Sequence, residues 1–270
     1  MAAASDNVNF LHLAGVNLYR STNGGSSWSQ PYADINTHVD FHTLKYNPLN
    51  HKLYAGHDGG ISVSEDDSYN WSYISDGLNI TQFYNFGVSQ SNSGLDVMFA
   101  GAQDNSLLYK NNNGWFRAVV GDGVNSKIHK DNENIMIGSV QYGIAMLKSA
   151  TSSPPFSDIT PQGQSGTGLW ELPFEMDPNN NDIVYAGYRK LFKSTNSGGS
   201  WTVVAGTNVT SNEVINQICP TTNPNIIYFS TRNSSGSKLF KTTNGGSSWA
   251  QIGVGALPDL IITDIATLDS

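Results

Sequence analysis

A polar turn that ends in an aromatic residue recurs along the chain, and it constrains the fold more than any other feature. "STNGGSSW" at 21–28 returns as "STNSGGSW" at 194–201 and "TTNGGSSW" at 242–249. Measured between the final aromatic residues, the gaps are 43, 44, 41, 45 and 48 residues. Six copies therefore divide the chain, and they end at Trp28, Trp71, Trp115, Phe156, Trp201 and Trp249. A period of roughly 40–50 residues is typical of β-propeller blades, each made of four strands.

The residues inside one repeat support this interpretation. The second repeat reads "FHTLKYNPLN", "HKLYAG", "GISVSED" and "WSYIS". These are four short runs rich in β-branched and aromatic residues, with turn residues between them. The fifth and sixth repeats show the same plan. We find no stretch with helical periodicity and no apolar run long enough to span a membrane.

The two ends of the chain complement each other. The N-terminal run "NFLHLAG" reads as a second strand, and the C-terminal run "LIITDIATLDS" reads as a first strand with nothing after it. Pairing the two would close a ring and remove its exposed sheet edges. We therefore predict an all-β fold: a single six-bladed β-propeller domain over 1–270, with four-stranded antiparallel blades and the C-terminal strand paired into the N-terminal blade. The expected blades are 7–34 plus 260–270, 35–77, 78–120, 121–160, 161–207 and 208–258.

Charge and composition exclude several classes of function. The formal net charge is −8, and 14 Lys and Arg residues are spread along the chain without a basic stripe, which argues against a nucleic-acid partner. Cys219 is the only cysteine, so no intrachain disulfide is possible. The sequence contains no glycine-rich phosphate loop and no Ser/His/Asp elbow, and we expect no cofactor.

The recurrent turn matches the pattern Ser/Thr-x-Asp/Asn-x-Gly-x-x-Trp/Phe. It resembles the Asp-box, or BNR repeat, of sialidases, sortilin-type receptors, photosystem assembly factors and two-propeller xyloglucanases. An Asx side chain can accept backbone hydrogen bonds in such a turn, and Gly supplies a positive φ, so we predict a structural role. Calcium binding is the alternative, but most copies carry neutral Asn. The residues of this predicted structural turn are Ser21, Asn23, Gly25, Trp28, Ser64, Asp66, Trp71, Ser194, Asn196, Gly198, Trp201, Thr242, Asn244, Gly246 and Trp249.

A second resemblance covers about 80 residues. The segment from "HDGGISVSED" to "GAQDNSLLYKNNNGWFRAVVGDG" is similar to large secreted bacterial BNR-repeat proteins. The resemblance implies an extracellular or cell-surface location and further domains flanking this chain in the full-length protein. Residues 1–10 lack the basic and apolar regions of a signal peptide. No activity follows from this resemblance.

The same family places its Asp-box turns away from the usual ligand face. We therefore expect a ligand on the loops between second and third strands and on those that lead into first strands. Their side chains vary while the flanking strands repeat, as when function is added to a repeated scaffold. Aromatic rings, amides and carboxylates suit a hydroxyl-rich ligand such as a glycan, and a solvated rim without a ligand is the alternative. The predicted rim residues are His57, Asp58, Gln103, Asp104, Gln141, Tyr142, Trp170, Tyr188, Arg189 and Arg232.

Two kinds of catalytic site are conceivable on this rim. A glycoside hydrolase would need two carboxylates, which Asp58, Asp104 and Asp122 could supply, and one of them would need a raised pKa inside a pocket. The alternating His38, Asp40 and His42 would share one strand face and could ligate zinc. A sialidase site needs three arginines around a carboxylate. Only two of the four arginines of this chain lie on the predicted rim, so we exclude a sialidase.

Three functions follow, in order of preference. The first is a non-enzymatic extracellular binding or adhesion module that recognises a glycan or a protein surface. The second is a glycoside hydrolase with a carboxylate pair on the rim. The third is a scaffold subunit of a secretion or assembly complex.

Overall fold

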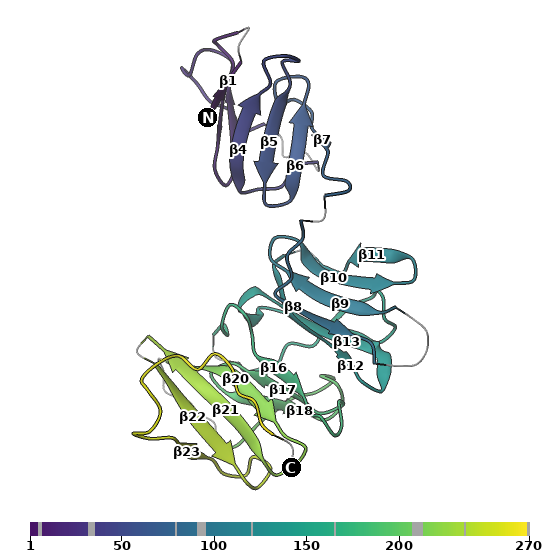
Figure 1. The fold of residues 1–270 in the computed structure, drawn as a ribbon, viewed down its shortest axis with the longest axis vertical. Helices are drawn as coiled ribbons and strands as arrows, with labels where there is room; N and C mark the ends of the chain where they lie inside the picture. Colours follow the sequence, from purple (N-terminus) through teal and green to yellow (C-terminus); the bar gives the residue numbers. More distant parts are fainter. Residues whose placement is uncertain are drawn as a thin grey trace. The chain divides into compact units, whose positions relative to one another are not determined.

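Short antiparallel strands joined by polar turns dominate the computed structural model of this chain (Figure 1). The structure describes residues 1–4, 7–31, 36–78, 80–90, 96–119, 121–164, 166–206, 213–234 and 236–268. They form two units, residues 1–81 and 82–270, which we call the N-terminal and C-terminal units. The 3-10 turn η1 (Gln141–Gly143) is the only helical element in the described ranges. No described helix is long and apolar enough to cross a membrane.

The N-terminal unit contains two sheets. In the first, β1 (Ala2–Ala3), β2 (Leu11–Ala14) and β3 (Leu18–Ser21) follow one another in space. A single bridge between Arg20 and Ser29 continues this sheet beyond β3. The second sheet has the order β4 (Phe41–Tyr46), β5 (Leu53–His57), β6 (Gly60–Ser64) and β7 (Ser72–Tyr73).

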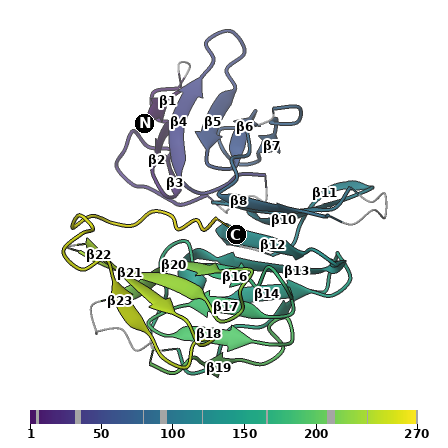
Figure 2. The same cartoon turned by 60° about the horizontal axis from the view of Figure 1, so that its bottom comes forward.

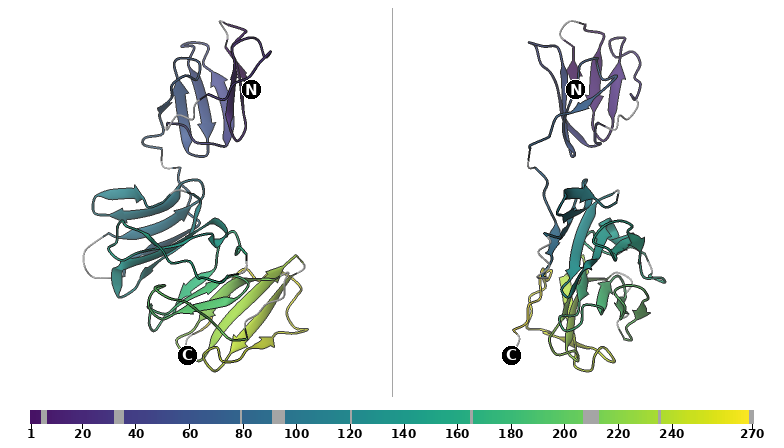
Figure 3. Two further views of the ribbon diagram at one scale, coloured as in Figure 1. Left: turned by 180° about the vertical axis from the view of Figure 1, so that it is seen from behind. Right: turned by 90° about the vertical axis from the view of Figure 1, so that its right-hand side faces the viewer.

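The C-terminal unit contains four further sheets, each a four-stranded antiparallel meander (Figures 1 and 3). The third sheet comprises β8 (Asn85–Val88), β9 (Met98–Ala102), β10 (Ser106–Asn111) and β11 (Gly114–Arg117). The fourth comprises β12 (Gly123–His129), β13 (Asn132–Val140), β14 (Met146–Ser149) and β15 (Ser157–Asp158). The fifth comprises β16 (Phe174–Met176), β17 (Val184–Gly187), β18 (Leu191–Ser194) and β19 (Thr202–Val203). The sixth comprises β20 (Val214–Pro220), β21 (Ile227–Asn233), β22 (Gly236–Thr242) and β23 (Ala250–Ile252).

The predicted fold class is confirmed: the chain is all-β, and its six sheets correspond to the six blades of a β-propeller. The structure differs from the prediction in how the edge of the first sheet is paired. Residues 260–268 form no strand, and the edge of β2 is instead paired with β1, through Ala2 with His12 and Ala3 with Leu11. Because β1 already satisfies that edge, the first sheet has no free ladder position beside β2 for the C-terminal segment.

Hydrophobic cores lie between consecutive sheets rather than within one sheet. The largest joins the fourth and fifth sheets, where Ile137, Met146, Phe174 and Phe192 are buried together. The aromatic residue of the recurrent turn contributes to these cores. Trp201 packs against this cluster and donates from Nε1 to the carbonyl of Ile159, at 2.6 Å. Trp249 packs against Phe229 in the core between the fifth and sixth sheets. Each blade is therefore stabilised mainly by its neighbour.

The recurrent turn has one hydrogen-bond pattern in its good copies. In the first, the Oγ of Ser21 accepts from the backbone N–H of Gly25, and Oδ1 of Asn23 accepts from that of Ser27, both at 2.9 Å. The turns that begin at Ser194 and Thr242 repeat both bonds. In the turn that begins at Ser64, Asp66 takes the place of Asn. These side chains are occupied in fixing the turn between the third and fourth strands.

Candidate functional site

A mostly polar pocket of about 470 Å³ lies in the C-terminal unit. It is formed where the first strands of four sheets come together, with Asn85 from β8, Asn125 from β12, Glu175 from β16 and Asn216 from β20. First strands lie side by side around the centre of a propeller, which explains why residues so distant in sequence share one pocket. The loop before β16, Arg232 of β21 and the C-terminal segment complete the wall. The remaining lining residues used below are Trp170, Glu171, Gln217, Ile261, Ile262 and Asp264.

Two buried asparagines in this pocket occupy corresponding positions. The register of β12 shifts between Gly123 and Ser126, and that of β20 shifts between Ile215 and Gln217. Asn125 and Asn216 lie at these shifts and are only 5% and 7% exposed. Each donates from Nδ2 to a main-chain carbonyl about 46 residues further along the chain, to Leu172 and Ile262 respectively. A bulge re-aims a strand side chain, and here it directs two amides toward neighbouring backbone.

The pocket also contains two carboxyl groups whose pKa is raised. Burial raises the pKa of Glu171, and the more distant charge of Lys127 opposes this only in part. Burial likewise raises the pKa of Glu175, although Nζ of Lys127 lies 2.9 Å from Oε2 of Glu175. Part of the Glu171 surface is exposed to solvent, so its carboxyl group is accessible from the pocket although its surroundings are partly desolvated. A raised pKa keeps a larger fraction of a carboxyl group protonated at a given pH, and the protonated form can donate a hydrogen bond or a proton.

Aromatic and cationic groups stand on the pocket wall and at its edge. Trp170 lines the pocket, and its Nε1 is buried without a hydrogen-bond partner among the described residues. The ring of Tyr142 meets Trp170 edge-on at 5.1 Å and is 46% exposed. Tyr142 has a φ of 57°, and its backbone N–H donates to the carbonyl of Trp170 at 2.9 Å. Trp170, Tyr142 and the exposed Arg232 thus provide stacking and hydrogen-bonding groups that a polar ligand needs.

Three predicted rim residues, Gln103, Asp104 and Gln141, and the candidate acid Asp122 do not line the pocket and bond to neighbouring loops instead. The backbone N–H of Asp104 donates to Oδ1 of Asp122 at 2.9 Å, and the N–H of Asp122 donates to Oε1 of Gln141 at 3.2 Å. Gln103 accepts from the hydroxyl of Tyr84 at 2.9 Å. These polar side chains connect adjacent loops. Asp104 and Asp122 therefore do not form an acid/base pair within the pocket.

Tyr188 and Arg189 are placed differently from the prediction. Tyr188 is fully buried, donates from its hydroxyl to the carbonyl of Gly143 at 2.8 Å, and has a raised pKa because of burial. It is a core residue and not part of an accessible rim. Arg189 is half-buried and donates to the carbonyl of Glu213 at 3.4 Å. Its guanidinium group bonds to the residue that directly precedes β20.

The predicted rim residues of the N-terminal unit also differ in exposure. His57 is only 6% exposed, and its Nε2 lies 2.9 Å from Oγ of Ser62. Burial lowers the pKa of His57, and the nearby His38 lowers it further. Asp58 lies in the turn after β5 and is bonded to Nε2 of His42. His57 is therefore a packed interior residue, whereas Asp58 is accessible.

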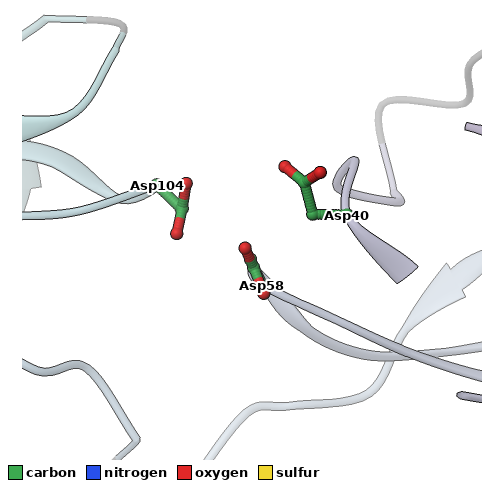
Figure 4. Close-up of side chains that lie close together, drawn as sticks. All are labelled: Asp40, Asp58 and Asp104. Carbon is green, nitrogen blue, oxygen red and sulfur yellow. The ribbon is translucent and has the colours of Figure 1, made fainter. Parts of the chain in front are cut away.

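The alternating His38, Asp40 and His42 do not share one strand face. The strand β4 begins at Phe41, and Asp40 has a φ of 60°, which breaks the alternation. His38 instead packs near the ring of His57, while His42 pairs with Asp58. Carboxylate oxygens of Asp40 and Asp58 lie within 4.8 Å of each other (Figure 4). Figure 4 also labels Asp104, which belongs to the C-terminal unit. We assign no metal site to this acidic pair.

Sequence reasoning missed most of the pocket. It identified Trp170 and Arg232, but not Glu175, Asn125 or Asn216 as site residues. A detectable signal was an asparagine directly after an apolar residue inside a first strand, as in "GVNSKIH" and "VINQICP". A buried amide in a strand needs a partner, and its partner here comes from another segment.

Comparison with known proteins supports the fold. No protein-family model and no curated protein sequence matches the chain. A solved GH74 xyloglucanase from Xanthomonas campestris is similar, with 16% identity and a TM-score of 0.50, over 88% of this chain and 37% of that one. A GH74 enzyme from Niastella koreensis has 17% identity and a TM-score of 0.45, over 93% and 46% of the two chains. YCF48 from Cyanidioschyzon merolae has 12% identity and a TM-score of 0.45, over 94% and 84%. This chain spans less than half of either GH74 structure. The Xanthomonas structure supports the β-propeller fold alone.

Proposed function

We propose that this chain is a non-enzymatic binding module outside the cell and that its ligand site is the polar pocket of the C-terminal unit. The observation that carries the proposal is the set of hydrogen-bonding side chains gathered there from four first strands. We also propose that the recurrent turns are Asp-box turns. Their shared hydrogen-bond pattern supports this assignment. The ligand is a polar chain, either a glycan or a segment of protein.

Several groups in the pocket are available to such a ligand. Within the described ranges, the side chains of Asn85, Gln217 and Arg232 make no hydrogen bond to protein. Asn85 and Gln217 are half-buried, and half-buried polar groups without partners are costly, so a ligand that satisfies them gains affinity. Arg232 is exposed and can add a charged contact. The indole of Trp170 adds a flat apolar surface beside these groups. This combination is typical of sites that orient a ligand by a few fixed polar contacts.

Binding to a glycan array and to a peptide library would test the proposal with a matched pair of arginine variants. For a ligand found in either assay, we expect Arg232→Ala to weaken binding about tenfold, which corresponds to about 1.4 kcal/mol. Arg117→Ala should change the affinity less than about twofold, because Arg117 is exposed on β11 and does not line the pocket. Equal effects of the two substitutions would contradict the proposed site.

A glycoside hydrolase is a second candidate, because the pocket holds two carboxyl groups with raised pKa. Glu171 would act as the general acid, and Glu175 is the second carboxyl group. General acid catalysis contributes roughly 10²–10⁴ in rate. We therefore expect Glu171→Gln to reduce any polysaccharide hydrolysis by at least about 100-fold, while Asp58→Asn leaves it unchanged. Reducing-end assays on plant and microbial polysaccharides would measure this.

The two assays together separate the candidate functions. Ligand binding without turnover contradicts the hydrolase. Turnover that is lost with Glu171→Gln contradicts a purely non-enzymatic module. Absence of both binding and turnover would favour the scaffold role, in which a surface of the chain contacts another protein.

A further inference from the structure

The C-terminal segment already lies in the pocket as an extended chain. Residues 261–264 line it, and Figure 2 shows this part of the chain running past β22 and β20 without forming a strand. Both main-chain groups of Ile262 are bonded to side chains of the sixth sheet. Its carbonyl accepts from Nδ2 of Asn216, and its N–H donates to Oγ of Ser237 at 3.0 Å.

The same type of hydrogen bond occurs two sheets earlier, in the fourth sheet. Asn125 donates to the carbonyl of Leu172, 3.3 Å away, just before β16 begins. Leu172 is fully buried, whereas Ile262 is only half-buried. Each of the two asparagines therefore bonds to a main-chain carbonyl, and this hydrogen bond does not depend on the side chain of the accepting residue. Asn216 and Ser237 together engage the carbonyl and the N–H of one residue, and a glycan has no main chain with these two groups at that spacing.

The segment is held by few interactions. Over 260–268 the structure records no ladder pairing, and Leu260 and Ile261 are 66% and 43% exposed. A segment with few buried apolar contacts and few backbone hydrogen bonds opens at low cost in free energy. Its departure would free Asn216 and Ser237 and would remove Asp264 from the pocket wall. Glu171 and Glu175 would remain there.

We propose that the pocket binds an extended peptide through its main chain, and that residues 260–264 occupy this site within the same molecule until a partner peptide displaces them. The proposal rests on the binding function proposed above and specifies its ligand class. An apolar side chain of the partner peptide would then take the place of the Ile262 side chain in the pocket wall. The apparent affinity for a partner is then reduced by the fraction of molecules in which the site is occupied.

A labelled peptide with the sequence of residues 258–268 provides the probe, added to the 270-residue chain. Ile262→Pro removes the N–H that donates to Ser237 and should release the resident segment. We expect the probe to bind at least about tenfold more tightly to Ile262→Pro than to the wild type. Ala266→Pro is the matched control, because Ala266 does not line the pocket, and it should behave as the wild type. Adding Asn216→Ala to Ile262→Pro should abolish the gain.

Amide hydrogen exchange gives a second readout in the same proteins. Residues 260–265 should exchange faster in Ile262→Pro than in the wild type, while β17 keeps its protection and so reports an intact fold. Faster exchange without tighter probe binding would overturn this inference. If a glycan still bound through Arg232 in that case, the binding function would stand and only the peptide ligand would be wrong. If Arg232→Ala affected no ligand, the pocket itself would be excluded.

Discussion

At the scale of single residues, the recurrent turn depends on one left-handed position. Gly25, Gly198 and Gly246 have φ values of 89°, 83° and 93°. The turn without a glycine places Ser68 there, with a φ of 67°. Residues other than glycine are strained in this region, so the glycine in the motif has a backbone reason and not a ligand-binding one.

Gly198→Ala tests this reason. A Cβ at Gly198 would lie 2.4 Å from Cδ1 of Ile159, and the positive φ adds backbone strain. We expect a loss of about 1–3 kcal/mol in the free energy of unfolding, measured by urea denaturation. Gly15→Ala is the control, because a Cβ there meets no atom within 4 Å, and it should change stability by less than about 0.5 kcal/mol. A similar loss in both variants would contradict the turn argument.

Buried histidines predict a pH dependence of stability. His12 is fully buried, with Nε2 bonded to Oγ of Ser68 at 2.9 Å, and burial lowers its pKa below the ordinary value of 6.5. The unfolded chain therefore binds a proton more readily. Stability is fully present above about pH 6.5 and falls as the pH drops toward the lowered pKa, by up to about 1.4 kcal/mol per pH unit.

Urea denaturation between pH 8 and pH 5 would measure this loss. His12→Gln should reduce the slope, and part of the slope should remain because burial also lowers the pKa of His57. Other groups beside His12, namely Arg20, Tyr46 and Asp67, are unchanged in this variant. A slope identical to that of the wild type would contradict the assignment to His12.

At the scale of elements, the first strand of each sheet differs from the others. The second and third strands carry most of the buried side chains, as in β17, where all four residues are buried. The first strands β12 and β20 combine apolar residues with a bulge and a buried asparagine. Regular strand pairing stabilises the sheet, whereas the local break in register places the asparagine side chains that bond to main-chain carbonyls. The strand runs could be predicted from sequence, but the bulges could not, because their position depends on pairing with the next strand.

At the scale of the whole molecule, stability arises between sheets. Phe192 is 1% exposed, and it packs edge-on against Tyr188 at 5.9 Å within the core shared by the fourth and fifth sheets. Phe192→Ala should reduce the free energy of unfolding by about 3–5 kcal/mol, measured by denaturation. Phe116→Ala is the control, because Phe116 is 39% exposed, and its effect should be much smaller. Equal effects would contradict a core that lies between sheets.

The sequence by itself determined the number of blades, the order of strands and the structural turn, because each of these rests on contacts within one repeat. His57 and Tyr188 lie in predicted loops, but their burial depends on packing against other segments. The pocket was decided only by the tertiary structure, since Asn85, Asn125, Glu175 and Asn216 come from four different sheets. The raised pKa values of Glu171 and Glu175 have the same origin. Desolvation is a property of the surroundings, and the surroundings exist only when distant strands are brought together.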